Sequence, residues 1–183
     1  YSYNVDSLFF RLTQEFEKHP NALAVGEVGL DFTTSCRCSG AHDRQSCVKG
    51  KIEAQHVFLE KALRLADQLG KPVIIHCRDK GDGSAAKGVL KAFVSLELTH
   101  LKVHRHCFVG NSEELDSWSN TLPDCYFSLS KHSTTDPKTI EALLLCDHQK
   151  LLLETDSPYL PFPGDNFHGP WRIGQVAKAV SNI

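Results

Sequence analysis

Short runs of aliphatic residues alternate along this chain with amphipathic segments. Five runs have the length and composition of buried strands, at residues 23–28, 73–77, 101–108, 125–129 and 151–154. Runs that are apolar at nearly every position suit strands covered on both faces, as in a parallel sheet. The sequence therefore predicts five buried strands.

The segments between these runs show the spacing of about 3.6 residues that is typical of amphipathic helices. They predict helices at residues 5–16, 52–69, 84–96, 111–119, 136–146 and 171–180, with a long polar loop at 33–49. Gly70 followed by Pro72 is a helix stop, and Pro137 after Asp136 is a helix start. Strict alternation of helix and strand indicates parallel strands joined by right-handed crossovers.

Two folds satisfy this alternation: an open doubly wound sheet and a closed β/α barrel. The open sheet typically has a glycine-rich phosphate turn after an early strand, whereas Gly26 and Gly29 lie within the first predicted strand. Histidines and acids at successive strand ends favour the barrel, which needs eight strands over roughly 250 residues. The prediction is a TIM-type (β/α)8 barrel with about five of its eight strands in this chain. Residues 1–183 would form one domain that lacks its N-terminal strands.

Composition narrows the class of protein. With 41% hydrophobic and 23% charged residues, the 183-residue chain is typical of a globular protein. Its formal charge of -2 gives no indication of nucleic-acid binding. No apolar run approaches the roughly 20 residues that span a bilayer, so no membrane partner is expected. Seven cysteines, several in predicted strands, argue against a disulfide framework and for an intracellular location, cytoplasmic or nuclear. The chain begins with Tyr1 and lacks methionine, so we expect a processed or truncated chain.

Carboxylates and imidazoles lie where the apolar runs end. Four residues occupy such positions: Glu27, His76, His106 and Asp156. His104 lies two residues before His106, on the same face of an extended strand. This mixture of ligands suits Zn²⁺, Mn²⁺ or Fe²⁺, and Mg²⁺ when carboxylates and water dominate. Two ions ~3.5–4 Å apart would activate water and hold the leaving oxygen, with Glu27 as a bridge.

Two further acids flank these positions. Asp31 can simply stabilise the turn after its strand, and Glu154 reads as a neighbouring surface carboxylate with a weaker claim to be a ligand. A single histidine on an apolar strand is more often a core residue than a ligand. The metal site is therefore predicted from the four strand ends taken together.

Five motifs occur in order along the chain: GEVGLD at 26–31, PVIIHCRD at 72–79, HCFVG at 106–110, YFSLS at 126–130 and LLETDSPYL at 152–160. With them the chain resembles the TatD-type metal-dependent deoxyribonucleases, which are amidohydrolase-like barrels. The resemblance implies two divalent metal ions, with Mg²⁺ favoured and Mn²⁺ or Zn²⁺ as alternatives. It implies that Glu27, His76, His106 and Asp156 bind them. Glu27 and Asp156 would be catalytic, and Asp156 would position or deprotonate the attacking water.

The same resemblance implies hydrolysis of DNA phosphodiester bonds, often from the 3′ end. The expected partners are single-stranded DNA or 3′ ends, with RNA also possible. Arg78, Lys131 and His104 are the candidate substrate contacts. Phe162, Phe167, His168 and Trp171 can stack on bases or simply cover the barrel. The alternatives are a metal-dependent hydrolase of small esters, amides or phosphate esters, and a non-catalytic barrel scaffold.

The chain departs from the family pattern in three places. A His-x-His pair expected on the first strand is absent before Glu27, so we expect it upstream of Tyr1. Lys131 stands where the family often has glycine. Residues 36–47 form an insertion with Cys36, Cys38, His42 and Cys47, the residue types of a zinc site. Their spacing matches no common zinc motif, which favours free thiols or one local disulfide.

Overall fold

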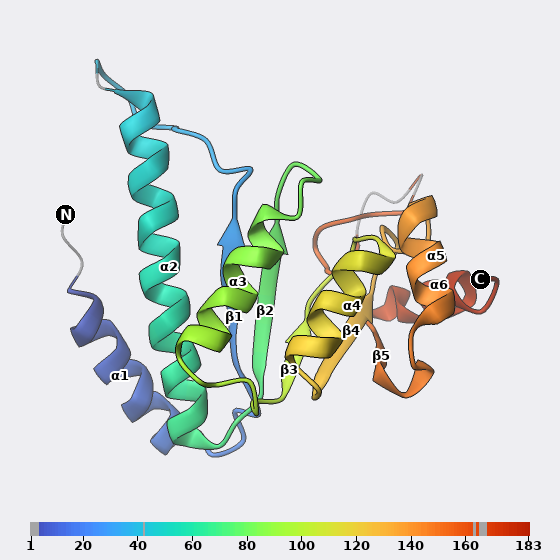
Figure 1. The fold of residues 1–183 in the computed structure, drawn as a ribbon, viewed down its shortest axis with the longest axis horizontal. Coiled ribbons are helices and arrows are strands. Elements are labelled where there is room, and N and C mark those ends of the chain that lie inside the picture. The colour runs from blue at the N-terminus through green and yellow to red at the C-terminus, as the bar shows by residue number, and fades with distance from the viewer. Residues whose placement is uncertain (1–3, 42, 163, 165–167) are drawn as a thin grey trace. The chain divides into compact units, whose positions relative to one another are not determined.

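The structure, a computed structural model, describes residues 4–41, 43–162, 164 and 168–183. Helices and strands alternate in the predicted order, and the chain divides into two compact units, residues 1–102 and 103–183 (Figure 1). All five predicted strands are present, and every strand pair within a unit is parallel. The extent of a single domain over residues 1–183 stays a prediction.

The first unit is built on two parallel strands covered by long helices. Its elements are α1 (Val5–Lys18), β1 (Val25–Asp31), α2 (Arg44–Leu69), β2 (Val73–Arg78) and α3 (Ser84–Ser95). Helices α2 and α3 pack against both strands and against each other, and α1 packs on α2 (Figure 1). Leu30, Leu63, Ile75 and Phe93 are fully buried in this core. The apolar runs thus became strands because their side chains fill the space under α2 and α3.

Helix α2 is longer than the sequence suggested. It begins at Arg44, whereas the periodicity predicted a start at Ile52 and a loop through Lys49. Asp43 caps the helix: its carboxylate accepts from the Gln45 N–H at 2.9 Å and from the Ser46 hydroxyl at 2.5 Å. The loop prediction was therefore wrong beyond Asp43, because a strong N-cap extends a helix over polar residues that carry no hydrophobic period.

The second unit has three parallel strands, with β4 in the middle. Its elements are β3 (Val103–Arg105), α4 (Ser112–Thr121), β4 (Cys125–Leu129), α5 (Pro137–Leu145), the 3₁₀ turn η1 (His148–Lys150), β5 (Leu151–Leu153), the 3₁₀ turn η2 (Pro170–Arg172) and α6 (Ile173–Val180). Phe108, Trp118 and Phe127 form the aromatic core, where the Phe108 and Phe127 rings meet edge to face at 5.1 Å.

Strand β3 is shorter than the predicted 101–108. Cys107 has a positive φ of 46°, which ends the extended conformation after Arg105. The Cys107 N–H donates to the Glu154 side chain, and the Phe108 N–H donates to the Ser128 carbonyl at 2.9 Å. His106 consequently lies on a turn just beyond the strand, and this turn is fixed by hydrogen bonds to β4 and to the residue after β5.

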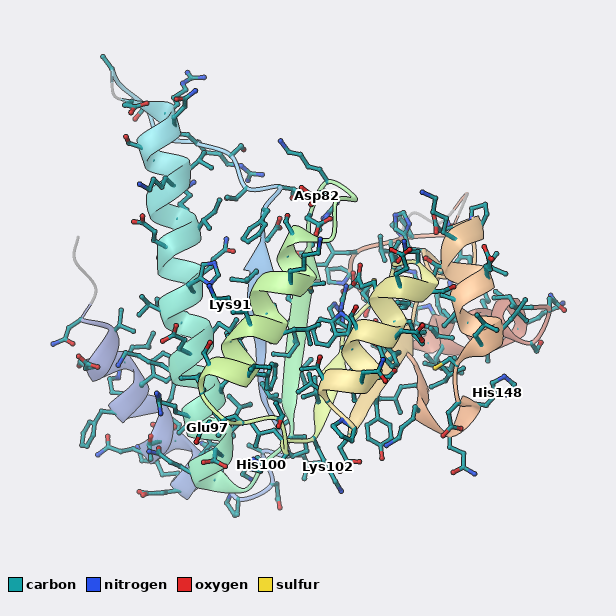
Figure 2. The ribbon with its side chains drawn as sticks, in the orientation of Figure 1. Asp82, Lys91, Glu97, His100, Lys102 and His148 are labelled. Carbon is teal, nitrogen blue, oxygen red and sulfur yellow. The ribbon has the colours of Figure 1, made fainter. Side chains whose placement is uncertain are left out.

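Charged and polar side chains lie on the outer surfaces of the helices and turns. Figure 2 labels Lys91 on α3 and Glu97, His100 and Lys102 in the segment that follows it. His100 Nε2 lies 2.9 Å from the Asp67 carboxylate of α2. Across the described ranges, none of the helices combines the length and the hydrophobicity needed to cross a bilayer.

Candidate metal centre

Glu27 lies in an irregular part of β1. The pairing of β1 with β2 shifts register within residues 25–28. A Cβ on Gly26, whose φ is +151°, would lie 2.7 Å from a β2 carbonyl oxygen, and a Cβ on Gly29 would lie 1.7 Å from another. Only glycine allows the two strands to approach this closely. The two glycines of the GEVGLD motif are therefore required by the close approach of β1 to β2 on either side of Glu27 and Val28.

His76 lies between two carboxylates in the first unit. Its Nδ1 is 2.8 Å from Glu27 Oε1, and its Nε2 is 3.8 Å from Asp31 Oδ2. We call Glu27, Asp31 and His76 the first-unit cluster. Burial raises the pKa of Asp31, but hydrogen bonds from the Thr33 hydroxyl and N–H at 2.6 and 2.7 Å lower it more, with help from His76 and Arg78. Asp31 is thus a turn residue, as predicted, and also an ionised neighbour of His76.

Arg78 ends the same strand. It lies two residues after His76, so its side chain leaves β2 on the same face. The side chain is exposed, and its charge contributes to the lowered pKa of Asp31. Its backbone carbonyl accepts from the Phe32 N–H at 2.8 Å, which fixes the end of β2 against the end of β1.

His106 also lies between two carboxylates, in the second unit. Its Nδ1 is 2.6 Å from Glu154 Oε2 and its Nε2 is 3.4 Å from Asp156 Oδ1. We call His104, His106, Glu154 and Asp156 the second-unit cluster. Burial raises the pKa of Glu154, yet hydrogen bonds from His106 and Ser128, the charge of His106 and the Cys107 N–H lower it overall. Glu154 is therefore ionised and held by several donors.

A metal-ligating histidine must be neutral, and an ionised Glu154 would then keep the remaining proton of His106 on Nδ1. The lone pair of Nε2 is then available on the side of Asp156. Two donors that bind one divalent ion at ~2.1 Å lie about 3.0–3.4 Å apart, and the 3.4 Å between Nε2 and Asp156 Oδ1 fits that spacing. A carboxylate that orients a ligating histidine through its other nitrogen is a recurrent feature of metal sites. The donor set of this cluster fits a divalent cation.

His104 lies on β3, two residues before His106, and its ring is close to that of His106. The two rings lie 6.3 Å apart and nearly perpendicular, and His104 Nε2 is 4.0 Å from Glu154 Oε2. His104, His106 and Glu154 present ligand atoms that all lie within 4.8 Å of one another. Arg105 leaves the opposite side, where its guanidinium is buried over the Trp118 ring at 5.6 Å. The alternation predicted for this strand agrees with these positions.

Comparison with known proteins places the chain in a family. The model of the family described as TatD related DNase matches residues 3–183. The chain belongs to the TatD-related DNase family. A human protein named 3'-5' RNA nuclease TATDN2 is 30% identical over 144 residues, which cover 78% of this chain and 17% of that protein.

A bacterial relative extends the match. The 3'-5' ssDNA/RNA exonuclease TatD of Edwardsiella piscicida is 31% identical over 174 residues, which cover 90% of this chain and 59% of that protein. The chain therefore spans less than two thirds of the length of these two relatives.

Solved structures show the same fold. The crystal structure of YJJV, a TatD homologue from Escherichia coli, aligns with a TM-score of 0.74 at 23% identity and covers 97% of this chain and 62% of that chain. A TatD family hydrolase from Entamoeba histolytica aligns with a TM-score of 0.62 at 22% identity, over 81% of this chain and 44% of that one. The predicted fold class is confirmed: this is an α/β chain with five parallel strands that covers part of a TatD-type barrel.

Glu154 differs from its prediction. The sequence predicts a neighbouring surface carboxylate, but only 15% of the side chain is exposed and it contacts His106 directly. The signal was present, because Glu154 precedes Asp156 by two residues and an extended chain places both on one face. Ser128 gave no such signal: its role depends on β4 lying beside the turn of Cys107, whose N–H donates to the Ser128 hydroxyl at 3.1 Å.

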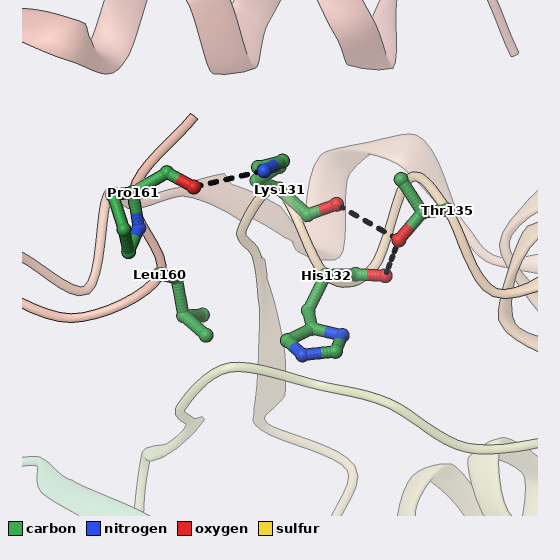
Figure 3. A pocket seen from close by; sticks show the side chains of 5 residues that line it. All are labelled: Lys131, His132, Thr135, Leu160 and Pro161. Atoms are coloured by element: carbon green, nitrogen blue, oxygen red, sulfur yellow. Dashed lines mark hydrogen bonds between the residues drawn. The ribbon is translucent and has the colours of Figure 1, made fainter. Parts of the chain in front are cut away.

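Lys131 takes part in a small pocket of the second unit. Lys131, His132, Thr135, Leu160 and Pro161 line it (Figure 3). The Lys131 Nζ donates to the Pro161 carbonyl at 2.8 Å and lies 5.2 Å from the centre of the Phe162 ring. Lys131 therefore ties the segment after β4 to the segment after β5.

The aromatic candidates divide into three cases. Phe162 lies 5.9 Å from the His168 ring, so both belong to one packed group. Trp171 is exposed. Phe167 lies outside the described residues, as does His42 of the cysteine-rich segment.

Proposed function

We propose that the protein is a metal-dependent hydrolase that cleaves phosphodiester bonds of single-stranded DNA from the 3′ end, with RNA as a further substrate. The observation that carries the proposal is the setting of His106 between an ionised Glu154 and Asp156, in a chain of the TatD-related DNase family. The relatives named as 3'-5' ssDNA/RNA exonuclease and 3'-5' RNA nuclease support the substrate class and the direction.

The proposed ligands of two divalent metal ions are Glu27, His76, His106 and Asp156. Carboxylate and imidazole donors of this kind suit Mg²⁺ and also accept Mn²⁺ or Zn²⁺. When bound, the ions would lower the pKa of a water molecule and neutralise charge on the phosphate. The first-unit and second-unit clusters each supply an imidazole with carboxylates beside it, which supports this assignment.

Three carboxylates of the chain would have the remaining roles in catalysis. Asp156 would accept the proton of the attacking water at its carboxylate, a role that requires an ionised acid next to the reacting atom. Glu27 would be the second catalytic carboxylate and a further ligand of the metal ions. Glu154 would hold His106 in the tautomer that presents Nε2, so it is a positioning residue.

Three cationic or imidazole side chains would bind the substrate. The exposed guanidinium of Arg78 can grip two phosphate oxygens in a bidentate manner. The positive charge of Lys131 would contact the phosphate backbone of the nucleic acid, and His104 would contact a phosphate or sugar near His106. Trp171, which is exposed, is the aromatic side chain best suited to stack on a base.

The proposal is tested by digestion of single-stranded DNA and of RNA of the same sequence, labelled separately at the 5′ and 3′ ends. Protein expressed from its complete coding sequence is assayed with Mg²⁺, with Mn²⁺ and with EDTA. We expect metal-dependent loss of the 3′ label first, abolished by His76→Ala and by Asp156→Ala. His148→Ala and Asp116→Ala, at exposed positions on η1 and α4, are the matched controls and should keep full activity.

Other outcomes identify the alternatives. Metal binding without cleavage of either polymer, together with turnover of p-nitrophenyl phosphate, would indicate a small-molecule hydrolase. Absence of both metal binding and turnover would indicate a non-catalytic scaffold. Loss of the 5′ label first would contradict the direction of cleavage but not the chemistry.

A further inference from the structure

Three cysteine side chains gather where the loop after β1 meets α2. Cys36 and Cys38 belong to the loop, and Cys47 lies in the first turns of the helix. Their sulfur atoms all lie within 4.8 Å of one another, and the Sγ atoms of Cys38 and Cys47 are 3.7 Å apart. The spacing of these cysteines in the sequence favours free thiols or one local disulfide over a zinc site. The structure places Cys47 on a helix capped by Asp43, and not in the predicted loop.

The spacing of the sulfur atoms is that of metal ligands. A disulfide holds its sulfur atoms ~2.05 Å apart. Two thiolates bound to one tetrahedral Zn²⁺ at ~2.3 Å lie about 3.8 Å apart, close to the 3.7 Å between Cys38 and Cys47. We propose that Cys36, Cys38 and Cys47 form a zinc site that joins the loop after β1 to helix α2.

The segments that carry the three thiols are held in place by other contacts. The Asp43 cap fixes where α2 begins, and the Lys51 Nζ donates to the Ser35 carbonyl at 2.8 Å. Further along the helix, Gln55 accepts from the Asp31 N–H at 2.7 Å and donates to the Asp31 carbonyl at 3.3 Å. These bonds position both sides of the site, so little conformational freedom is lost when an ion binds.

The surroundings suit a site with three thiolates. Such a site carries a net charge of −1 with Zn²⁺, and positive side chains beside it reduce the cost of that charge. Arg44, Lys49 and Lys80 line the same open pocket as Cys36. Cys38 is exposed, so water or an external group can complete the tetrahedron.

Zinc bound at this site would fix the loop that begins at the end of β1. This loop follows directly from the strand that carries Glu27 and Asp31. Zinc would stabilise the closed loop and leave the packed core of the first unit unchanged. The inference does not depend on nuclease activity, and its test has readouts of its own.

The first test uses Co²⁺ as a spectroscopic substitute for Zn²⁺. Thiolate ligands give Co²⁺ a near-ultraviolet charge-transfer absorption that imidazole and carboxylate ligands do not, so ions bound at His76 or Asp156 do not interfere. We expect this absorption in the native protein, its loss on addition of Zn²⁺, and its absence in the triple variant Cys36→Ser/Cys38→Ser/Cys47→Ser. Cys77→Ser, which alters a half-buried thiol of the same unit, is the control and should retain the absorption.

The second test uses trypsin, which cleaves after Arg37, between two of the proposed ligands. Zn²⁺ should slow cleavage at Arg37 by roughly tenfold or more, because it binds only the closed loop. Cys47→Ser should be cleaved equally fast with and without Zn²⁺. This assay also serves if the triple variant fails to fold, since it compares the native protein with a single substitution.

Several results would overturn the proposal. They are a native protein without the charge-transfer absorption, an absorption that persists in the correctly folded triple variant, and tryptic cleavage that Zn²⁺ does not change. Alkylation of denatured protein, purified without reductant, followed by peptide mapping should find Cys36, Cys38 and Cys47 as free thiols. A pair of these three that resists alkylation until reductant is added would instead establish a disulfide.

Discussion

The two clusters have the same chemistry in different settings. In each, one imidazole lies between two carboxylates. In the first-unit cluster, 33% of the His76 side chain and 44% of the Glu27 side chain are exposed; in the second-unit cluster, the figures are 13% for His106 and 15% for Glu154. An exposed pair exchanges its contacts with water at little cost, whereas a buried acceptor whose donors are removed stays unsatisfied.

This difference in burial predicts that the two clusters contribute differently to the stability of the fold. Glu154 receives hydrogen bonds from His106, Ser128 and the Cys107 N–H, so it fixes the turn after β3 as well as the histidine. Glu27 has an imidazole neighbour on an exposed face of a bulged strand. The second-unit cluster is therefore pre-organised by the fold, and the first-unit cluster can be altered with little effect on stability.

The largest expected effect is on turnover. Asp156→Asn removes the proposed proton acceptor and one proposed anionic ligand, so we expect nuclease activity to fall by about 10³-fold or more. The fold should remain, because asparagine keeps the size and polarity of the Asp156 side chain. Activity is measured on single-stranded DNA, with Asp116→Asn on α4 as the control. Activity within a few-fold of the native protein would remove Asp156 from the mechanism.

The next effect is on stability and tests the comparison directly. Glu154→Ala leaves the His106 Nδ1 without its Glu154 acceptor and the Cys107 N–H with the Ser128 hydroxyl alone, so we expect a loss of about 2–3 kcal/mol in the free energy of unfolding. Glu27→Ala should cost no more than about 0.5 kcal/mol, because its contact is exposed. Urea unfolding without added metal measures both. Equal losses would refute the distinction between the clusters.

A smaller effect concerns pH. The pKa of Glu154 in the folded protein lies below its ordinary value of 4.5. Its ionised form therefore stabilises the fold above about pH 4.5, and this contribution disappears as the pH falls through the lowered pKa. We expect the difference in urea midpoint between native protein and Glu154→Gln to shrink on acidification from neutral pH. A difference that stays constant down to about pH 3 would show that Glu154 is not held as an anion.

The smallest effect is expected at Lys131. Because its ammonium binds the Pro161 carbonyl, Lys131→Ala should lower stability by less than about 1 kcal/mol. If Lys131 also contacts the nucleic acid, KM should rise and the salt dependence of binding should weaken. Lys138→Ala, an exposed lysine on α5, is the matched control. An effect on stability alone would leave Lys131 as a tie between two loops.

The sequence by itself determined the elements and the chemistry of the candidate residues. The apolar runs predicted five strands, and Asn111 and Asp136 predicted helix starts that the structure confirms, since their side chains accept from N–H groups three residues later at 2.9 and 2.8 Å. Gly70 ends α2 in the left-handed conformation that a glycine stop implies. These features were readable because each depends on residues that are close together along the chain.

Only the tertiary structure decided which side chains meet. Glu154 and His106 are 48 residues apart, and their contact depends on the turn at Cys107 and on the order of β3, β4 and β5. The gathering of Cys36, Cys38 and Cys47 depends on the helix that Asp43 extends. Periodicity and spacing report which face of an element a residue occupies. Contacts between elements are set by strand register and by where helices begin, and these follow from the packing of the whole unit.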